Sequence, residues 1–429
     1  MNIIWRSHPA PSLSGTVRVP GDKSISHRAI MLGALADGTT HISGFLEGED
    51  CLATMRAFQA MGVAIEHHGE GRVTVHGAGL HGLRAPTAPL DVGNSGTSMR
   101  LLAGVLAGQP FNSVLVGDSS LMKRPMRRVT KPLALMGAEI ATSDAGTAPL
   151  VIHGRPLRAI EYTLPVASAQ LKSALLLAGL FAEGTTRITE TGVSRDHSER
   201  MLKAMGAQIS RNGLAIEVAP LSSPLKPLEI FIPNDPSSAF FFAVAAAITP
   251  GSRIVLKNML LNKTRIEAYE ILKRMGAEVK FHKTSEIYEQ IGDIEVAYAP
   301  LHAVEVSENI SWLIDEAPAL AIAFACAQGS SVLRNAAELR VKECDRIKVT
   351  CEGLRACGIK ARELQDGWQI EGGEANAAII TPCGDHRIAM SFAILGLRSG
   401  MIIEDSDCIA TSFPNFAAIL RQIGAGVED

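Results

Sequence analysis

A sixfold internal repeat constrains the fold of this chain more than any other feature of its sequence. A short segment of the form apolar-x-x-Met-Gly, with small variations, recurs about every 70 residues. The six copies end at Gly62, Gly137, Gly206, Gly276, Gly358 and Gly424. Most copies lead into a short alternating segment such as VAIEHH or AEVKFH, which predicts a helix, a glycine turn and a strand in each repeat.

A second series of segments alternates with the first and predicts one buried helix per repeat. These segments open with small polar or charged residues, which are good N-caps, and continue as Ala- and Leu-rich stretches. They are SISHRAIMLGALADG, GTSMRLLAGVLAG, SAQLKSALLLAGL, DPSSAFFFAVAAAI, DEAPALAIAFACAQG and DHRIAMSFAILGLRSG. Because each helix is apolar nearly all round, it has to be buried on most sides.

The number of repeats predicts two lobes. Six α/β units exceed what one hydrophobic core normally holds, so we expect three units in each lobe. The segment IPNDPSSAF, with Pro233 and Pro236, lies between the third and fourth units and is the expected crossing point.

Composition narrows the class of protein. A formal charge of -3 over 429 residues argues against a protein that coats nucleic acid or an anionic membrane, since both need a basic excess. The seven cysteines form no CxxC pair, which favours neither a disulfide framework nor a zinc site. The sequence has no signal-peptide pattern and no apolar run of about 20 residues. We therefore expect a soluble, cytoplasmic protein.

The polar starts of the buried helices hold more charge than capping requires. Lys23, Ser24 and Arg28 surround one helix start, where backbone N–H groups and the helix dipole favour an anion. No GxxxxGK[ST] pattern is present, which argues against a nucleotide triphosphatase. Gly96, in GNSGTSMR, permits close approach of a ligand, although by itself it could be only a turn glycine. The cation-rich segment GDSSLMKRPMRR could likewise be a solvated loop.

Carboxylates accompany the cations in the second half of the chain. Asp315 and Glu316 stand at the start of an apolar helix, and Asp385 precedes His386 and Arg387 at another. Acids at helix starts often serve only the dipole, and the alternating charges of ELRVKECDRIK are typical of an exposed helix start. Taken together, the helix starts predict a cationic cleft with a few carboxylates, suited to small polyanionic substrates and metal-free acid–base chemistry.

Nine motifs follow one another along the whole chain: PGDKSISHRA, GNSGTSMR, KRPM, SAQ, VSRDH, LIDEAP, RVKECDR, DHR and TSFP. In sequence and in order they resemble the motifs of the EPSP synthase family. SAQLKS, RVKECDR and IATSFP resemble the class II branch, which includes glyphosate-tolerant bacterial enzymes. Thr411 stands where class I members commonly have lysine, so we assign no catalytic role there.

The resemblance implies a fold. It is a two-lobed inside-out α/β barrel of six repeated units, three per lobe, with buried helices. One lobe would combine residues 1–20 with 236–429, and the other would hold residues 21–235, with the active site in the cleft between them.

The resemblance also implies a reaction and a set of site residues. The enolpyruvyl group of phosphoenolpyruvate would pass to the 5-hydroxyl of shikimate 3-phosphate in the shikimate pathway to chorismate. The residues implied for shikimate 3-phosphate are Lys23, Ser24, Arg28, Ser168, Ala169, Gln170, Arg195, Asp315 and Lys342. Those implied for phosphoenolpyruvate are Lys23, Gly96, Arg124, Gln170, Arg346 and Arg387. Asp315 would be the base, Glu343 the acid, and Lys23 would assist near the departing phosphate.

Further expectations follow from the same resemblance. No cofactor would be obligatory, a monovalent cation could assist, and the enzyme would be a monomer without nucleic-acid or membrane partners. Glyphosate would compete with phosphoenolpyruvate, since Gly96 is retained where tolerant members can carry alanine.

Other functions fit the sequence less well. The related UDP-N-acetylglucosamine enolpyruvyl transferase has a loop with a reactive cysteine, whereas GDSSLMKRPMRR has none. A non-catalytic repeat protein would not need Asp315 and Glu343 among so many cations. A nucleic-acid end-processing enzyme would need a basic groove with aromatic residues for stacking.

Overall fold

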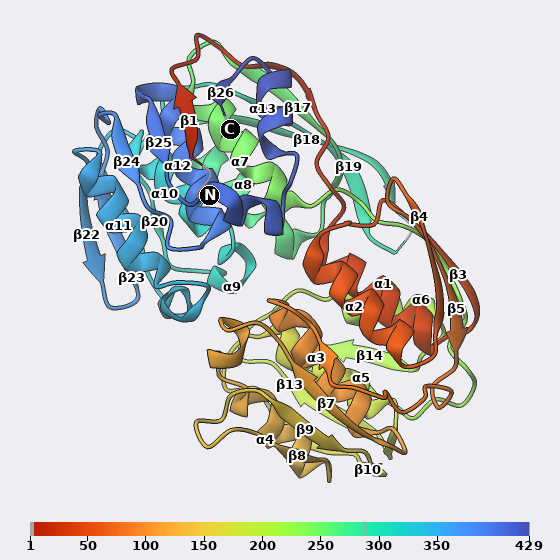
Figure 1. The fold of residues 1–429 in the computed structure, drawn as a ribbon. Helices are drawn as coiled ribbons and strands as arrows, with labels where there is room; N and C mark the ends of the chain where they lie inside the picture. The colour runs from red at the N-terminus through yellow and green to blue at the C-terminus, as the bar shows by residue number, and fades with distance from the viewer. Residues whose placement is uncertain (1–3, 287, 429) are drawn as a thin grey trace. The chain divides into compact units, whose positions relative to one another are not determined.

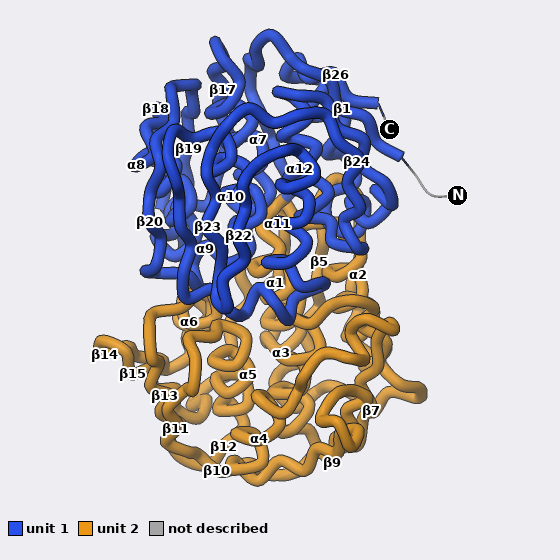
Figure 2. Tube along the Cα trace, turned by 90° about the vertical axis from the view of Figure 1, so that its left-hand side faces the viewer, with its two compact units in different colours: residues 1–20, 233–429 blue, residues 21–232 orange. Residues whose placement is uncertain are grey.

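The computed structural model describes residues 4–286 and 288–428, which form two compact units. Unit 1 comprises residues 1–20 and 233–429, and unit 2 comprises residues 21–232 (Figure 2). The chain therefore passes from unit 2 back to unit 1 between residues 232 and 233, whereas the sequence predicted this boundary between residues 235 and 236. The shift arises because the backbone of Asn234 already hydrogen bonds with Asn258 and Leu260 of unit 1.

Each unit contains three four-stranded sheets of one topology. In every sheet an edge strand pairs in parallel with its neighbour, and the remaining pairs are antiparallel. The unit 2 sheets are β16 (Glu229–Phe231)-β3 (Asp37–Ser43)-β5 (Arg72–Ala78)-β4 (Ala64–Gly69), β6 (Leu90–Asp91)-β7 (Asn112–Val116)-β9 (Leu150–His153)-β8 (Glu139–Ala141) and β11 (Glu161–Thr163)-β13 (Thr186–Thr189)-β15 (Ala215–Val218)-β14 (Ile209–Asn212). A short pair, β10 (Leu157–Arg158) and β12 (Ala182–Glu183), accompanies them.

Unit 1 repeats this arrangement. Its sheets are β2 (Ser14–Val17)-β17 (Arg253–Leu260)-β19 (Gln290–Ala297)-β18 (Glu278–Glu286), β20 (Glu305–Val306)-β21 (Ser330–Leu333)-β23 (Gly367–Glu371)-β22 (Lys360–Leu364) and β24 (Ala378–Ile380)-β25 (Met401–Ile403)-β1 (Trp5–His8)-β26 (Gly426–Glu428). The N-terminal strands β1 and β2 complete sheets formed by the second half of the chain. This is why residues near the N-terminus belong to unit 1.

One helix of each repeat is buried along nearly its whole length, as predicted. These helices are α1 (Lys23–Leu35), α3 (Gly96–Ala107), α5 (Ala169–Gly179), α7 (Pro236–Ile248), α10 (Ala317–Ala325) and α12 (His386–Ser399). Their side chains form the cores, and the sheets lie outside them. In unit 2, for example, β3 and β5 lie along one side of α1 (Figure 1).

The second helix of each repeat ends two residues before the glycine that marks the repeat. These helices are α2 (Glu49–Ala60), α4 (Arg127–Leu135), α6 (His197–Ala204), α8 (Glu267–Arg274), α11 (Arg346–Ala356) and α13 (Phe416–Gln422). The six glycines have φ between +80° and +111°, a left-handed conformation that glycine adopts without steric cost. The predicted glycine caps are confirmed.

Short elements complete the described chain. They are α9 (Ile310–Leu313) and the 3₁₀ turns η1 (Leu121–Lys123), η2 (Lys263–Arg265), η3 (Ala337–Val341) and η4 (Ser406–Thr411). Within the described residues no helix combines the length and apolar character that a membrane span requires.

Candidate active site

The start of α1 is held by acidic side chains. Asp22, fully buried, caps the helix by accepting a hydrogen bond from the backbone N–H of Ile25 at 2.8 Å. Lys23 forms an ion pair with Asp50, the second residue of α2. The ammonium group predicted to contact both substrates is therefore held by the neighbouring helix.

Arg28, predicted to contact shikimate 3-phosphate, is buried and joins three helices. Its Nε donates to Ser198 Oγ and its Nη2 to Ser173 Oγ, both at 2.7 Å. Its Nη1 donates to the backbone oxygen of Ser24 at 2.9 Å. Because Ser173 lies on α5 and Ser198 on α6, the guanidinium orientation is fixed by the packing of unit 2.

The start of α3 brings two arginines close to Gly96. Arg100 Nη1 donates to Gln170 Oε1 at 2.7 Å, and Gln170 in turn donates to Thr97 Oγ1 at 3.0 Å. Arg124 donates to Asn94 Oδ1 at 2.7 Å. A β-carbon at Gly96 would lie 2.8 Å from Arg100 Nη1 and 3.4 Å from Arg124 Nη1, so this glycine borders both guanidinium groups.

Ser168 and Ala169 open α5. Ser168 caps the helix through the backbone N–H of Leu171 at 3.4 Å, and Ala169 is its first residue. The backbone N–H groups of this turn and the side chain of Gln170 lie at one helix start.

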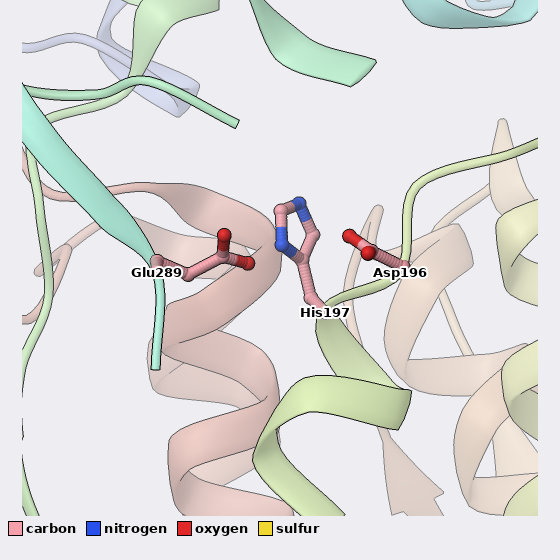
Figure 3. Close-up of side chains that lie close together, drawn as sticks. All are labelled: Asp196, His197 and Glu289. Atoms are coloured by element: carbon pink, nitrogen blue, oxygen red, sulfur yellow. The ribbon is translucent and has the colours of Figure 1, made fainter. Parts of the chain in front are cut away.

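Arg195 and the residues after it open α6. Figure 3 shows the side chains of Asp196 and His197 at the start of this helix. Glu289, labelled in the same picture, belongs to unit 1. The loop before Arg195 is anchored by Ser194, whose backbone N–H donates to buried Glu190 at 3.1 Å.

A buried ion network lies behind that loop. Lys172 Nζ lies 3.1 Å from Glu190 and 2.7 Å from Glu199, and the Lys172 side chain is completely inaccessible. Arg211 also pairs with both glutamates. Each buried charge thus has opposite charges beside it, as burial requires.

In unit 1, the predicted acid and base lie around one buried arginine. Arg346 donates to Glu343 Oε2 at 2.6 Å and to Asp385 Oδ2 at 2.7 Å, and its Nη1 lies 3.9 Å from Asp315. Lys342 Nζ lies 3.9 Å from the same Asp315 oxygen. The side chains of Asp315 and Glu343 are each 24% exposed, whereas Asp385 is fully buried. Small molecules can therefore reach two of the three carboxylates.

The charges around Arg346 keep it protonated. Burial by itself would lower the pKa of the guanidinium, but Asp385, Glu343 and Asp315 together raise it above its usual value. Arg387 Nη1 donates to the backbone oxygen of Asp315 at 3.0 Å, which places a second guanidinium at this cluster.

Several residues of these clusters were not assigned to the site from sequence. Asp50 holds Lys23, Ser173 and Ser198 hold Arg28, and Asp385 holds Arg346. The sequence does offer a clue to Asp385, because this residue stands in the DHR motif at a helix start. Asp50, Ser173 and Ser198 look like ordinary helix residues and become site neighbours only through tertiary packing.

Comparison with known proteins decides the family. The sequence profile described as EPSP synthase (3-phosphoshikimate 1-carboxyvinyltransferase) matches residues 8–420. The chain is 59% identical over 431 residues to the 3-phosphoshikimate 1-carboxyvinyltransferase of Campylobacter hominis, with 100% of both proteins covered. It is 58% identical to the protein of the same name from Campylobacter curvus, with 96% of both covered. The chain belongs to the EPSP synthase family.

Solved structures agree with this membership. The EPSP synthase of Acinetobacter baumannii is similar with a TM-score of 0.89 and 47% identity, covering 100% of both chains. The enolpyruvyl transferase NikO of Streptomyces tendae has a TM-score of 0.81 at 17% identity, covering 99% and 98%, and shares the fold. The predicted family and fold class of the chain are confirmed.

Proposed function

We propose that this EPSP synthase family member carries out its reaction with cations of unit 2 and a carboxylate–arginine cluster of unit 1. The reaction transfers the enolpyruvyl group of phosphoenolpyruvate to the 5-hydroxyl of shikimate 3-phosphate and releases phosphate. The observation that carries the proposal is the grouping of Asp315, Glu343 and Lys342 around buried Arg346, with both carboxylates accessible. An acid, a base and two cations are the groups that this chemistry needs.

The substrates are bound by different helix starts. For shikimate 3-phosphate we propose Lys23, Ser24, Arg28, Ser168, Ala169, Gln170, Arg195, Asp315 and Lys342. For phosphoenolpyruvate we propose Lys23, Gly96, Arg124, Gln170, Arg346 and Arg387. Backbone N–H groups at the starts of α1, α3 and α5 favour anions, and the guanidinium groups match carboxylate and phosphate oxygens.

The addition step moves two protons, and the elimination step moves a third. Asp315 takes the proton of the 5-hydroxyl while the hydroxyl oxygen bonds to C2 of phosphoenolpyruvate. Glu343 delivers a proton to the methylene carbon, and a tetrahedral intermediate forms. The C–O bond to phosphate then breaks, the Glu343 carboxylate takes back a proton from the new methyl group, and the enolpyruvyl double bond is restored. Lys23 stabilises the charge of the departing phosphate.

Finer properties belong to the same proposal. The enzyme is a cytoplasmic monomer of the class II branch, it needs no obligatory cofactor, and a monovalent cation assists at most. Glyphosate competes with phosphoenolpyruvate for the arginines near Gly96.

Phosphate release tests the proposal. Phosphate should appear from phosphoenolpyruvate only when shikimate 3-phosphate is present, with one enolpyruvyl product formed per phosphate. Release that depends instead on UDP-N-acetylglucosamine would identify the related transferase, and release without any acceptor would indicate a phosphatase. Either result would overturn the proposed reaction.

A further inference from the structure

Four buried polar side chains form a continuous row across the helices of unit 2. His27 Nδ1 lies 2.7 Å from Thr54 Oγ1, and Thr54 Oγ1 lies 2.6 Å from Ser98 Oγ. Ser98 Oγ lies 2.6 Å from Ser95 Oγ. The row starts on α1, crosses α2 and ends at the N-cap of α3, and no member is more than 1% exposed.

The direction of each hydrogen bond follows from the end of the row. Ser98 donates its single hydroxyl proton to Ser95 Oγ, so the Thr54 hydroxyl has to donate to Ser98. Thr54 then has no proton left for His27, and the His27 ring has to donate from Nδ1. The row therefore runs from His27 through Thr54 and Ser98 to Ser95, and it requires the Nδ1–H tautomer. The His27 Nδ1 atom also has a longer contact, of 3.4 Å, with Ser98 Oγ.

Burial keeps this arrangement in one protonation state. Desolvation lowers the pKa of His27 to about 3, against the opposing effect of Asp50 and Asp22 and with the help of Lys23 and Arg28. The ring is therefore neutral at neutral pH. Its Nε2 has no hydrogen-bond partner within the described part of the chain, as suits an unprotonated nitrogen in apolar surroundings.

The row ends where the phosphoenolpyruvate residues begin. Ser95 Oγ accepts both the backbone N–H of Ser98, at 3.1 Å, and the Ser98 hydroxyl. These bonds set the first turn of α3, which contains Gly96 and Thr97. Thr97 holds Gln170, and Gln170 holds Arg100.

Thr54 has an alternative acceptor. Its hydroxyl lies 3.3 Å from the backbone oxygen of Asp50. Without the His27 donor, Thr54 can turn toward Asp50 and Ser98 can donate back to Thr54. Ser95 would then lose one of its two bonds.

We propose that His27 is a positioning residue for the phosphoenolpyruvate site, acting through its Nδ1–H and the Thr54–Ser98–Ser95 row on the first turn of α3. Its side chain is fully buried, and it is not among the residues proposed to contact substrate. The proposal rests on the proposed function, because it assigns Gly96 and its neighbours to the donor substrate.

Two substitutions of His27 distinguish the loss of its hydrogen-bond donor from a change in side-chain volume. In His27→Asn the side-chain amide can occupy the place of Nδ1 and donate to Thr54, whereas His27→Leu fills the space without a donor. We expect His27→Leu to raise the KM for phosphoenolpyruvate about fivefold, the worth of one hydrogen bond, with kcat and the KM for shikimate 3-phosphate changed less than twofold. His27→Asn should stay within twofold of the unchanged enzyme.

A second pair tests the middle of the row. Thr54→Val removes the hydroxyl and should reproduce the effect of His27→Leu, while Thr54→Ser keeps the hydroxyl and should behave as the unchanged enzyme. Equal KM values in the Leu and Asn variants, or equal values in the Val and Ser variants, would overturn the proposal.

The tautomer can be read without any assay of activity. In ¹⁵N-labelled protein, His27 should show a protonated Nδ1 and an unprotonated Nε2 between about pH 6 and 8. A protonated Nε2 would overturn the row, whatever the reaction. Failure of the proposed function would appear separately, as absence of acceptor-dependent phosphate release in the unchanged enzyme.

Discussion

Arg28, Arg100 and Arg124 in unit 2 have different kinds of partners from Arg346 in unit 1. In unit 2, hydroxyl, amide and carbonyl oxygens contact Arg28, Arg100 and Arg124. In unit 1, Arg346 is held by the carboxylates of Asp385 and Glu343. Lys23 departs from the pattern of unit 2, since it pairs with Asp50.

The difference suggests a division of labour. Contacts with neutral oxygens orient a guanidinium group so that it can meet a substrate anion. A carboxylate beside a buried guanidinium is instead held in one orientation, which suits a group that accepts or donates a proton. We therefore propose that the unit 2 cluster serves binding, whereas the unit 1 cluster adds the acid–base groups to its share of the binding residues.

Removing a carboxylate of unit 1 tests this division most strongly. We expect Asp315→Asn and Glu343→Gln each to lower turnover by at least about a hundredfold, as for a general acid or base. Binding of shikimate 3-phosphate, measured by calorimetry, should remain detectable because the cations of unit 2 are unchanged.

The matched control is Glu371→Gln, also in unit 1. The exposed side chain of Glu371 pairs with exposed Lys360 at 3.2 Å, and its loss should leave turnover within twofold. Near-normal turnover in either site variant would remove acid–base chemistry from this cluster.

The next largest expected effect is a difference in the free energy of unfolding between variants of the two clusters. Asp385→Asn removes the charge that lies 2.7 Å from buried Arg346, and we expect unfolding in urea to require about 3 kcal/mol less. Asn remains a good N-cap, so the loss would report the ion pair rather than the start of α12. Ser198→Ala, which removes a hydroxyl from Arg28, should cost about 1.5 kcal/mol. Equal losses would show that the two ways of holding arginine do not differ in energy.

The repeat explains why much of the fold could be predicted from sequence. Gly62 and the five equivalent glycines mark a local conformation that few other residues adopt, and the all-round apolar character of α7 or α10 leaves no alternative to burial. Both features depend only on neighbouring residues, so they can be recognised without knowledge of the tertiary structure.

The partners of the site residues could not be predicted in the same way. Lys172 lies within the apolar segment LKSALLLAG, and its partners Glu190 and Glu199 are 18 and 27 positions away on other elements. Likewise, the pairing of Lys23 with Asp50 depends on how α1 packs against α2. Such contacts follow from packing, which no spacing in the sequence encodes.

The arginines near Gly96 allow a test of binding in unit 2. A methyl group at this position would come within 2.8 Å of Arg100 Nη1, which is buried and held by Gln170. We expect Gly96→Ala to raise the inhibition constant of glyphosate at least about fivefold more than the KM for phosphoenolpyruvate, because the longer inhibitor tolerates less displacement.

Gly373→Ala serves as its control. A methyl group there would meet only Ile359 at 3.9 Å, so both constants should stay unchanged. If the two constants rise equally in Gly96→Ala, or if the unchanged enzyme ignores millimolar glyphosate, this glycine does not set the sensitivity.

The smallest expected effect is a pH dependence of the unfolding free energy that comes from His27 in unit 2. The pKa of this histidine is about 3 in the folded chain and near 6.5 when unfolded, so below pH 6.5 the unfolded state binds a proton that the folded state does not. Its contribution to stability is full above the unfolded pKa and falls as the pH drops toward 3. Between about pH 7 and 5.5 the unchanged protein should therefore lose about 1 kcal/mol more unfolding free energy than His27→Asn, in which the other titrating groups are the same. Urea denaturation of both proteins at the two pH values measures the difference. An equal loss in both would mean that His27 accepts a proton in the folded state, and the neutral hydroxyl-linked row in unit 2 would not exist as described.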